Sequence, residues 1–181
     1  NSADHDGRYY TKSQLDPIIR NLLLNHWTSR DSGTTSDLWD VAYANGLWVA
    51  VGAGGTIRTS TDGTSWTSRF GGTTFSLGSV AYGNGLWVAA GSNGTILTST
   101  NGTTWTPRSS GTSEHLQGVT YANGLWVVVG NGGAILTSTN GTSWTSRTSG
   151  TSASLTGVAY ADSLWVVVGV GGTILTARAE L

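Results

Sequence analysis

The chain has 181 residues, enough for one domain with a buried core. Only 10% of the residues are charged and the net charge is −1, which argues against a nucleic-acid-binding protein because such a protein needs a basic patch. The absence of cysteine excludes disulfides and thiolate metal sites, and no apolar stretch reaches the roughly 18 residues that a membrane-spanning helix needs. We therefore expect no nucleic-acid partner and no membrane insertion.

Residues 1–26 stand outside the pattern that governs the rest of the chain. Asp16 is a good N-cap and Pro17 suits the first helical position. An apolar stripe at helical spacing follows: Leu15, Ile18, Ile19, Leu22 and Leu23. The pattern predicts a short helix over residues 17–25, which is too short to be stable alone in water. We expect its stripe to pack on other copies of the segment, with some contact to the rest of the chain.

From residue 27 onwards the sequence repeats itself, and Trp27 and Trp66 lie 39 residues apart. Two series of tryptophans mark the repeat: Trp27, Trp66, Trp105 and Trp144, and Trp48, Trp87, Trp126 and Trp165. The first copy predicts four strands at residues 40–43, 47–51, 56–60 and 65–69. Asn45 and Gly46 form a strong hairpin signal between the first two strands. The second strand is apolar throughout, as expected of a strand buried on both faces.

A four-stranded unit that is buried on both faces and repeated with short turns is the blade of a β-propeller. The sequence therefore predicts an all-β, four-bladed β-propeller with 39-residue repeats over residues 27–181, preceded by the short helix. A β-solenoid is the alternative, although its repeats are usually shorter. The fourth copy ends before its own fourth strand, so we predict that residues 27–30 pair with residues 173–177, close the ring and remove its free edges.

The turn S-T-D-G-T-S-W at residues 60–66 resembles the Asp-box of sialidase-like propellers, from which it departs by one missing residue between Asp and Gly. It recurs at residues 99–105 and 138–144, with asparagine in place of aspartate. The resemblance implies a structural turn remote from any active site, in which a carboxylate or amide oxygen accepts hydrogen bonds from turn amides. We therefore expect Asp62, Asn101 and Asn140 to be structural.

A second resemblance lies at residues 5–12, H-D-G-R-Y-Y-T-K, which is similar to the His-Asp-x-Arg-Tyr-Tyr-Thr-Lys motif of bacteriophage tail-fibre and tail-tip proteins. The resemblance implies an extracellular fibre tip on the virion and a homotrimer through residues 5–25. The chain also contains no methionine. We therefore expect it to be the C-terminal part of a longer fibre protein.

Catalytic residues are not evident in the pattern. A sialidase needs an arginine triad with a Tyr/Glu pair and an Asp acid, yet four arginines of the repeats occupy one repeated position: Arg30, Arg69, Arg108 and Arg147. Glutamate occurs only at Glu114 and Glu180, so no paired carboxylates suit glycoside hydrolysis. The three histidines, at positions 5, 26 and 115, lack metal-ligand spacing. We predict no catalytic residue, no metal site and no cofactor.

The informative signal is where the four copies disagree. Differences gather in the connection from the fourth strand to the next repeat and in the turn between the second and third strands, which emerge at the same end of an up-and-down blade. The predicted ligand-binding residues in these loops are Asp37, Trp39, Phe75, Ser92, Asn93, Glu114, His115, Gln117 and Asn131. The opposite turns vary little until Asp162 and Ser163 in the fourth copy. Loops on a rigid scaffold are where binding usually occurs.

Aromatic rings beside short polar side chains suit a sugar, because rings stack on its apolar face while polar groups bind its hydroxyls. We therefore predict recognition of a host cell-surface glycan. A purely structural module of the fibre tip and a sialidase-like hydrolase are the alternatives, and neutral drift in unrestrained loops would also produce differences between copies. Arg58 replaces a leucine that the other copies keep, and either an edge position with the charge in water or a ligand contact would explain it.

Overall fold

The computed structural model describes residues 2–3, 9–10, 17 and 27–178. The chain divides into two compact units, Asn1–Arg30 and Asp31–Leu181. In the first unit β1 (Ser2–Ala3) pairs antiparallel with β2 (Tyr9–Tyr10). The helix expected over residues 17–25 lies outside the described residues apart from Pro17, as does most of the segment expected to trimerise. No helix in the described part of the chain is long and apolar enough to cross a membrane.

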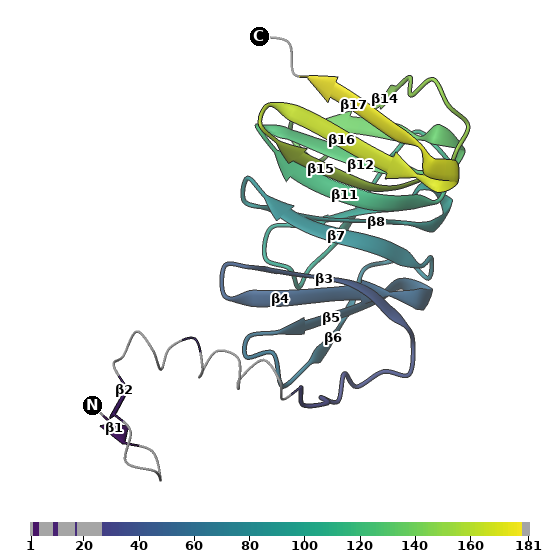
Figure 1. Cartoon of the computed structure of the whole chain (residues 1–181). Helices are drawn as coiled ribbons and strands as arrows, with labels where there is room; N and C mark the ends of the chain where they lie inside the picture. The colour runs from purple at the N-terminus through teal and green to yellow at the C-terminus, as the bar shows by residue number, and fades with distance from the viewer. Residues whose placement is uncertain (1, 4–8, 11–16, 18–26, 179–181) are drawn as a thin grey trace. The chain divides into compact units, whose positions relative to one another are not determined.

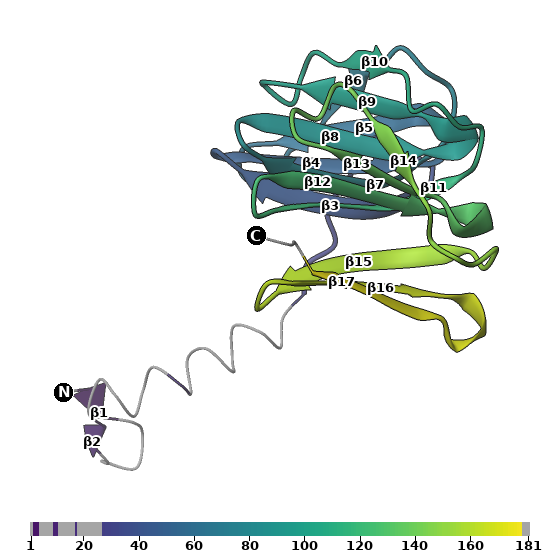
Figure 2. The same ribbon diagram turned by 90° about the horizontal axis from the view of Figure 1, so that it is seen from above.

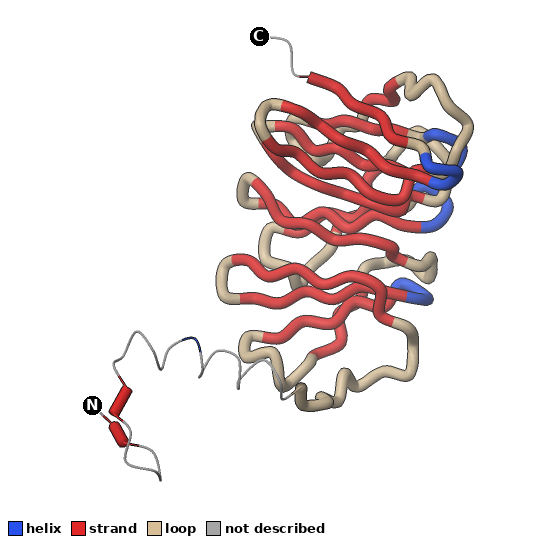
Figure 3. Tube along the Cα trace, viewed as in Figure 1, coloured by secondary structure: helices blue, strands red, loops and turns tan. Residues whose placement is uncertain are grey.

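The second unit consists of four antiparallel sheets, one for each repeat (Figures 1 and 3). The first sheet contains β3 (Leu38–Ala44), β4 (Leu47–Gly52), β5 (Thr56–Ser60) and β6 (Thr67–Phe70). The second contains β7 (Leu77–Gly83), β8 (Leu86–Gly91), β9 (Ile96–Ser99) and β10 (Thr106–Arg108). The third contains β11 (Leu116–Ala122), β12 (Leu125–Gly130), β13 (Ile135–Ser138) and β14 (Thr145–Arg147). The fourth contains β15 (Leu155–Ala161), β16 (Leu164–Gly169) and β17 (Ile174–Arg178).

Short 3₁₀ turns join the second and third strands of each sheet. They are η1 (Ala53–Gly55), η2 (Ser92–Gly94), η3 (Asn131–Gly133) and η4 (Val170–Gly172). The hairpin between β3 and β4 turns at Asn45 and Gly46, whose φ angles are +49° and +76°. Both residues tolerate this left-handed backbone, and such two-residue turns match the twist of the flanking strands.

The turn between β5 and β6 is held by side chains. The Asp62 carboxylate accepts hydrogen bonds from the backbone N–H groups of Thr64 and Ser65 at 2.7 and 2.8 Å. These bonds, that of Ser65 first, hold the pKa of Asp62 well below its usual range. Asn101 accepts the equivalent pair of bonds in the second sheet, at 2.9 Å each. The neutral side chain of Asn101 thus accepts the same hydrogen bonds as the Asp62 carboxylate. The residue at this position therefore stabilises the turn through its acceptor oxygen and needs no charge to do so.

The hydrophobic core lies between successive sheets. Val49 and Val51 of the first sheet pack with Leu77 and Trp87 of the second, and the next two sheet pairs repeat this arrangement. The first strands also pack in sequence: β3 against β7, β7 against β11, and β11 against β15. In Figure 2 the fourth strands β6 and β10 lie on the opposite side of this unit from β3 and β15.

The predicted ring closure is wrong for the single chain. Residues 27–30 form no strand, Trp27 is 90% exposed, and β17 pairs only with β16. Within the second unit, the first and fourth sheets lie at opposite ends with the other two between them (Figure 1). β6, β10 and β14 each follow the strand they pair with through a short turn. A closing strand at residues 27–30 would instead have to pair with β17, which requires the first and fourth sheets to meet. A long-range closure of this kind carries a larger entropy cost than a hairpin.

Candidate ligand-binding face

The connections between sheets and the 3₁₀ turns lie together at one end of the strands (Figure 3). Ala53 N–H donates to the Asp37 carbonyl at 2.9 Å, and Asn131 N–H donates to the His115 carbonyl at 2.8 Å. Each turn is thereby tied to the connection that precedes its own sheet. Gly94 N–H donates to the Glu114 carbonyl at 2.8 Å, which ties a turn to the following connection as well. We call residues 31–37, 71–76, 109–115 and 148–154, together with η1–η4 and with Trp39, Gly78 and Gln117 near the starts of β3, β7 and β11, the variable face.

Glycine permits the close contact between turn and connection. Gly94 has a φ of +64°, and a Cβ atom at this position would lie 1.9 Å from the Thr112 carbonyl oxygen. The same approach recurs at Gly133, where the Thr151 carbonyl oxygen would lie at 1.9 Å. Any side chain here would displace the connection, so these glycines define the shape of the surface beside them.

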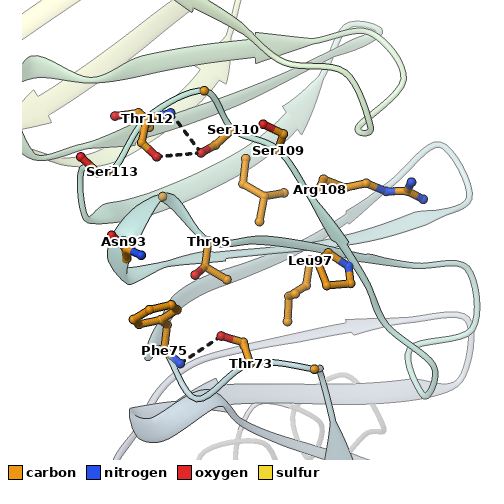
Figure 4. Close-up of a pocket in the computed structure, with 15 residues that line it drawn as sticks. Thr73, Phe75, Asn93, Thr95, Leu97, Arg108, Ser109, Ser110, Thr112 and Ser113 are labelled. Atoms are coloured by element: carbon orange, nitrogen blue, oxygen red, sulfur yellow. Dashed lines mark hydrogen bonds between the residues drawn. The ribbon is translucent and has the colours of Figure 1, made fainter.

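The first hollow of the variable face lies between the second and third connections and has a volume of about 610 Å³. Phe75 and Asn93 line one side of it, with the hydroxyl side chains of Ser110 and Thr112 across from them (Figure 4). Phe75 is 47% exposed. Its backbone N–H donates to the Thr73 hydroxyl at 3.0 Å, which fixes the start of the bend that carries the ring. The hollow therefore offers an aromatic surface beside amide and hydroxyl groups.

A second hollow of about 630 Å³ occupies the equivalent place in the next repeat and shares Thr112 with the first. Glu114 stands here at the position of Phe75, and Gly132 at that of Asn93. The two hollows are thus formed by equivalent residues of successive repeats but differ in chemistry, since the first carries an aromatic ring and the second a carboxylate.

A third hollow, of about 300 Å³, is lined by Trp39, Gly78, His115 and Gln117. Trp39, Gly78 and Gln117 are equivalent residues at which the pairing of the first strand shifts register. Such bulges re-aim a side chain out of the regular ladder. Trp39 is half exposed, so its ring is accessible at this hollow.

Hydrogen bonds fix the polar groups around the third hollow. His115 Nδ1 shares a hydrogen bond of 2.8 Å with the Ser92 hydroxyl. The Gln117 amide donates to the Asn131 side-chain oxygen. Both pairs link a connection or first strand to a 3₁₀ turn, so these four side chains are oriented before any ligand arrives.

The structure therefore sorts the nine predicted residues into groups. Trp39, His115 and Gln117 line the third hollow, and Ser92 and Asn131 are hydrogen-bonded to His115 and Gln117, respectively. Phe75 and Asn93 share the first hollow, and Glu114 lines the second. Asp37 is exposed on the connection before Trp39.

Sequence comparison among the copies missed several lining residues of the first hollow, namely Thr73, Thr95, Arg108, Ser110 and Thr112. These residues or close counterparts recur in other copies, so they show no asymmetry. Their only signal is their place: Thr73, Ser110 and Thr112 lie in the connections, Thr95 precedes β9, and Arg108 ends β10. Arg58 is held by the first connection, because its guanidinium donates to the Gly33 carbonyl at 2.7 Å.

The described residues contain no cluster of three or more His, Cys, Asp or Glu side chains that could hold a metal ion. Arg108 and Arg147 border the first two hollows, yet the Nε–H of each donates to a threonine of the neighbouring strand, at 2.9 and 2.8 Å. These arginines are thereby oriented along their own sheets.

No family model matches the sequence, and no curated protein is significantly similar to it. Among solved structures, the chain is similar to the computationally designed Ika4 protein, with a TM-score of 0.68 and 15% identity over 84% of this chain and 100% of that chain. YCF48 from Cyanidioschyzon merolae gives a TM-score of 0.65 and 20% identity over 80% of this chain and 54% of that chain. The computationally designed Ika8 protein gives a TM-score of 0.66 and 15% identity over 80% of this chain and 46% of that chain.

The chain therefore spans about half the length of YCF48 and of Ika8. At these low identities the similarity shows the fold alone, which is of the β-propeller type.

Proposed function

We propose that the chain is a non-catalytic receptor-binding tip and that its variable face binds a glycan of a host cell surface. The observation that carries the proposal is the gathering of the asymmetric residues, two exposed aromatic rings among them, around open hollows at one end of an otherwise repetitive fold. An apolar ring with polar neighbours is the combination that a sugar requires.

The shape of the hollows favours an extended, hydroxyl-rich ligand. Two open hollows lie on successive connections and turns, and a third lies at the register shifts of the first strands beside His115. Phe75 and Trp39 provide apolar surfaces for the faces of sugar rings. Ser92, Gln117 and Asn131 carry hydroxyl and amide groups that donate and accept hydrogen bonds. Neighbouring hollows could then hold successive units of one polysaccharide.

The tail-fibre resemblance of residues 5–12 supports a place at the tip of a phage fibre, outside the host cell. A homotrimer through residues 5–25 belongs to the same proposal. A structural module of the fibre tip is the competing function, and it predicts that the hollows stay empty. A peptide is a competing ligand, since YCF48 has been solved bound to the D1 peptide.

The proposal is tested by probing an array of bacterial surface polysaccharides and lipopolysaccharides with the labelled full chain. We expect a restricted set of glycans to bind, and binding to be lost in the double variant Trp39→Ala/Phe75→Ala. Thr104→Ala is the control, because Thr104 is exposed in the turn between β9 and β10, outside the variable face. Absence of binding to every glycan, or equal binding by the double variant, would contradict the proposal.

A further inference from the structure

The first sheet exposes apolar residues that the other sheets bury. We call the side that each sheet turns toward its predecessor the leading face. In the first sheet it exposes Leu38 (38%), Val41 (52%), Tyr43 (55%) and Trp48 (36%). In the second sheet the counterparts Leu77, Val80 and Trp87 are 0%, 4% and 2% exposed. The residue types are the same, so the difference comes from the missing preceding sheet.

The last sheet shows the complementary defect on its trailing face, the side that each sheet turns toward its successor. Val168 is 43% exposed and Ile174 is 67% exposed. Their counterparts in the first sheet, Val51 and Ile57, are 0% and 1% exposed because the second sheet covers them. Among the described residues, the stack thus has an uncovered apolar face at each end. These two faces are the two halves of an interface that the chain already forms three times.

A second copy of the chain could cover both exposed faces: its trailing face fits the leading face of the first copy, and its leading face fits the trailing face of the first copy. The two faces lie at opposite ends of the stack (Figure 1). The four sheets also superpose on about half of the longer Ika8 chain, with a TM-score of 0.66. We propose that two copies associate head to tail, each leading face on the partner's trailing face, and form a closed ring of eight sheets. Two identical head-to-tail contacts close the assembly and leave no free end. Three copies cannot all pair in rings of two, so with a trimeric stem the two copies of a ring come from different trimers.

Residues 27–30 complete the proposed ring. In the inner repeats, the strand before each connection is the fourth strand of the preceding sheet: β6 precedes the connection to β7 and completes the first sheet. The segment W-T-S-R at residues 27–30 precedes the connection to β3. It therefore belongs to whichever sheet stands before the first one, which in the ring is the three-stranded last sheet of the partner.

Side-chain pairing gives the register of this added strand. Arg69 Nε–H donates to the Thr59 hydroxyl at 2.9 Å, and the same bond recurs in the second and third sheets. Thr176 is the equivalent threonine of β17, and Arg30 is the equivalent arginine. In the first sheet Ile57 lies opposite Arg69, so Ile174 of one copy should lie opposite Arg30 of the other.

Arg58 is the one departure from apolar character on the leading face, where the second and third sheets carry the buried Leu97 and Leu136. Its guanidinium is held at the Gly33 carbonyl. Its Nε is buried without a hydrogen-bond partner, so this point of the leading face carries an unsatisfied donor where the next two sheets carry leucine.

Cysteine cross-linking tests the assembly, because the chain contains no other cysteine. A Cβ atom on Gly78 would lie 3.7 Å from the Cα atom of Gln117, the equivalent residue of the next sheet. Across the proposed junction the equivalent pair is Thr156 of one copy and Trp39 of the other. The full-length double variant Thr156→Cys/Trp39→Cys is oxidised, and Gly78→Cys/Gln117→Cys serves as the geometric control within one chain.

We expect most of the Thr156→Cys/Trp39→Cys protein to run on a non-reducing denaturing gel as a covalent dimer, twice the 18.8 kDa of one chain. The control pair should form its disulfide within a single chain. Association through residues 5–25 does not affect the result, because the denaturing gel dissociates every non-covalent contact and only chains joined by a disulfide migrate together. An internal disulfide in a single chain would show that the chain closes on itself and would overturn the proposal.

Two further outcomes overturn it: a ladder of products beyond two chains, and no disulfide where the control pair cross-links. Ile174→Asp in the same double-cysteine background should abolish the covalent dimer, because a carboxylate would be buried between the two faces. Thr106→Asp, on the exposed outer strand of the second sheet, should leave the dimer unchanged. Equal dimer yields in both variants would show that the trailing face does not form the contact.

Discussion

Replacing equivalent tryptophans in the first and second sheets should have different costs. Trp48 and Trp87 occupy the same place in successive repeats and pack against equivalent tyrosines with tilted rings. The ring centroids are 4.6 Å apart for Tyr43–Trp48 and 5.0 Å apart for Tyr82–Trp87. Trp87 is 2% exposed and Trp48 is 36% exposed. The local contacts are therefore alike, and the difference in burial measures what the preceding sheet contributes.

The magnitude follows from this burial. Truncation of a fully buried tryptophan to alanine costs about 3–5 kcal/mol, which we expect for Trp87→Ala at any protein concentration. Trp48 keeps about two thirds of its surface buried in the single chain, so Trp48→Ala should cost roughly 2–3 kcal/mol when the chains are separate. When a second copy covers Trp48, the cost should rise toward that of Trp87→Ala.

Denaturant unfolding followed by circular dichroism, at nanomolar and at micromolar protein, measures both costs. Trp48→Phe is the control, since it keeps an aromatic ring at the same place. Equal costs for Trp48→Ala and Trp87→Ala at the lowest concentration would mean that a single chain buries both residues alike. The open stack would then be the wrong description of the single chain.

Two further predictions concern the turns. Hydrogen bonds from the turn amides lower the pKa of Asp62, so its stabilising contribution is present above the ordinary carboxyl pKa of about 4 and is lost as the pH falls below it. Asp62→Asn keeps the acceptor oxygen, as Asn101 does, and should lose less stability than the parent between pH 7 and pH 2 in thermal melts; identical pH profiles would contradict this account. Gly94→Ala should destabilise the fold by more than Gly111→Ala. A Cβ atom on Gly94 would meet the Thr112 carbonyl oxygen, whereas one on Gly111 meets nothing within 4 Å. Gly111→Ala therefore carries only the cost of its left-handed backbone, roughly 1–2 kcal/mol. Equal melting temperatures would show that the connection yields freely.

Local features of the fold were predictable from the sequence. The tryptophan spacing and the Asn45-Gly46 turn predicted four similar sheets, which the structure contains. The first strands proved longer than expected, since β3 begins at Leu38 and includes the register shift beside Trp39. A bulge adds one residue without changing the residue types, so the apolar pattern did not reveal it.

The ends of the stack were not predictable from the repeat. Val41 and Val80 are the same residue in nearly the same local sequence, yet one is 52% exposed and the other 4%. Burial here depends on whether another sheet stands in front, which is a property of the assembly and not of the repeat. For the same reason the sequence predicted a closing strand at residues 27–30 that the single chain does not form.

The variable face was predicted from differences between the four copies of the repeat, so residues that recur in the copies were not predicted. Phe75 and Glu114 differ from their counterparts and were found, whereas Thr95 and Ser110 are close to theirs and were missed although they line the first hollow. The pairing of His115 with Ser92 joins a connection to a turn of another sheet. Only the packing of successive sheets brings these two residues together.

The most direct test of glycan recognition is calorimetric titration of a glycan that binds on the array into the parent chain, Phe75→Ala, Trp39→Ala and the control Thr104→Ala. Removing an exposed aromatic ring from a binding surface typically costs about 1–3 kcal/mol. We expect the Kd to rise by roughly 10-fold or more in at least one aromatic variant and to stay unchanged in the control, with equal melting temperatures throughout. Parent-like affinity in both Phe75→Ala and Trp39→Ala would contradict a glycan site on the variable face.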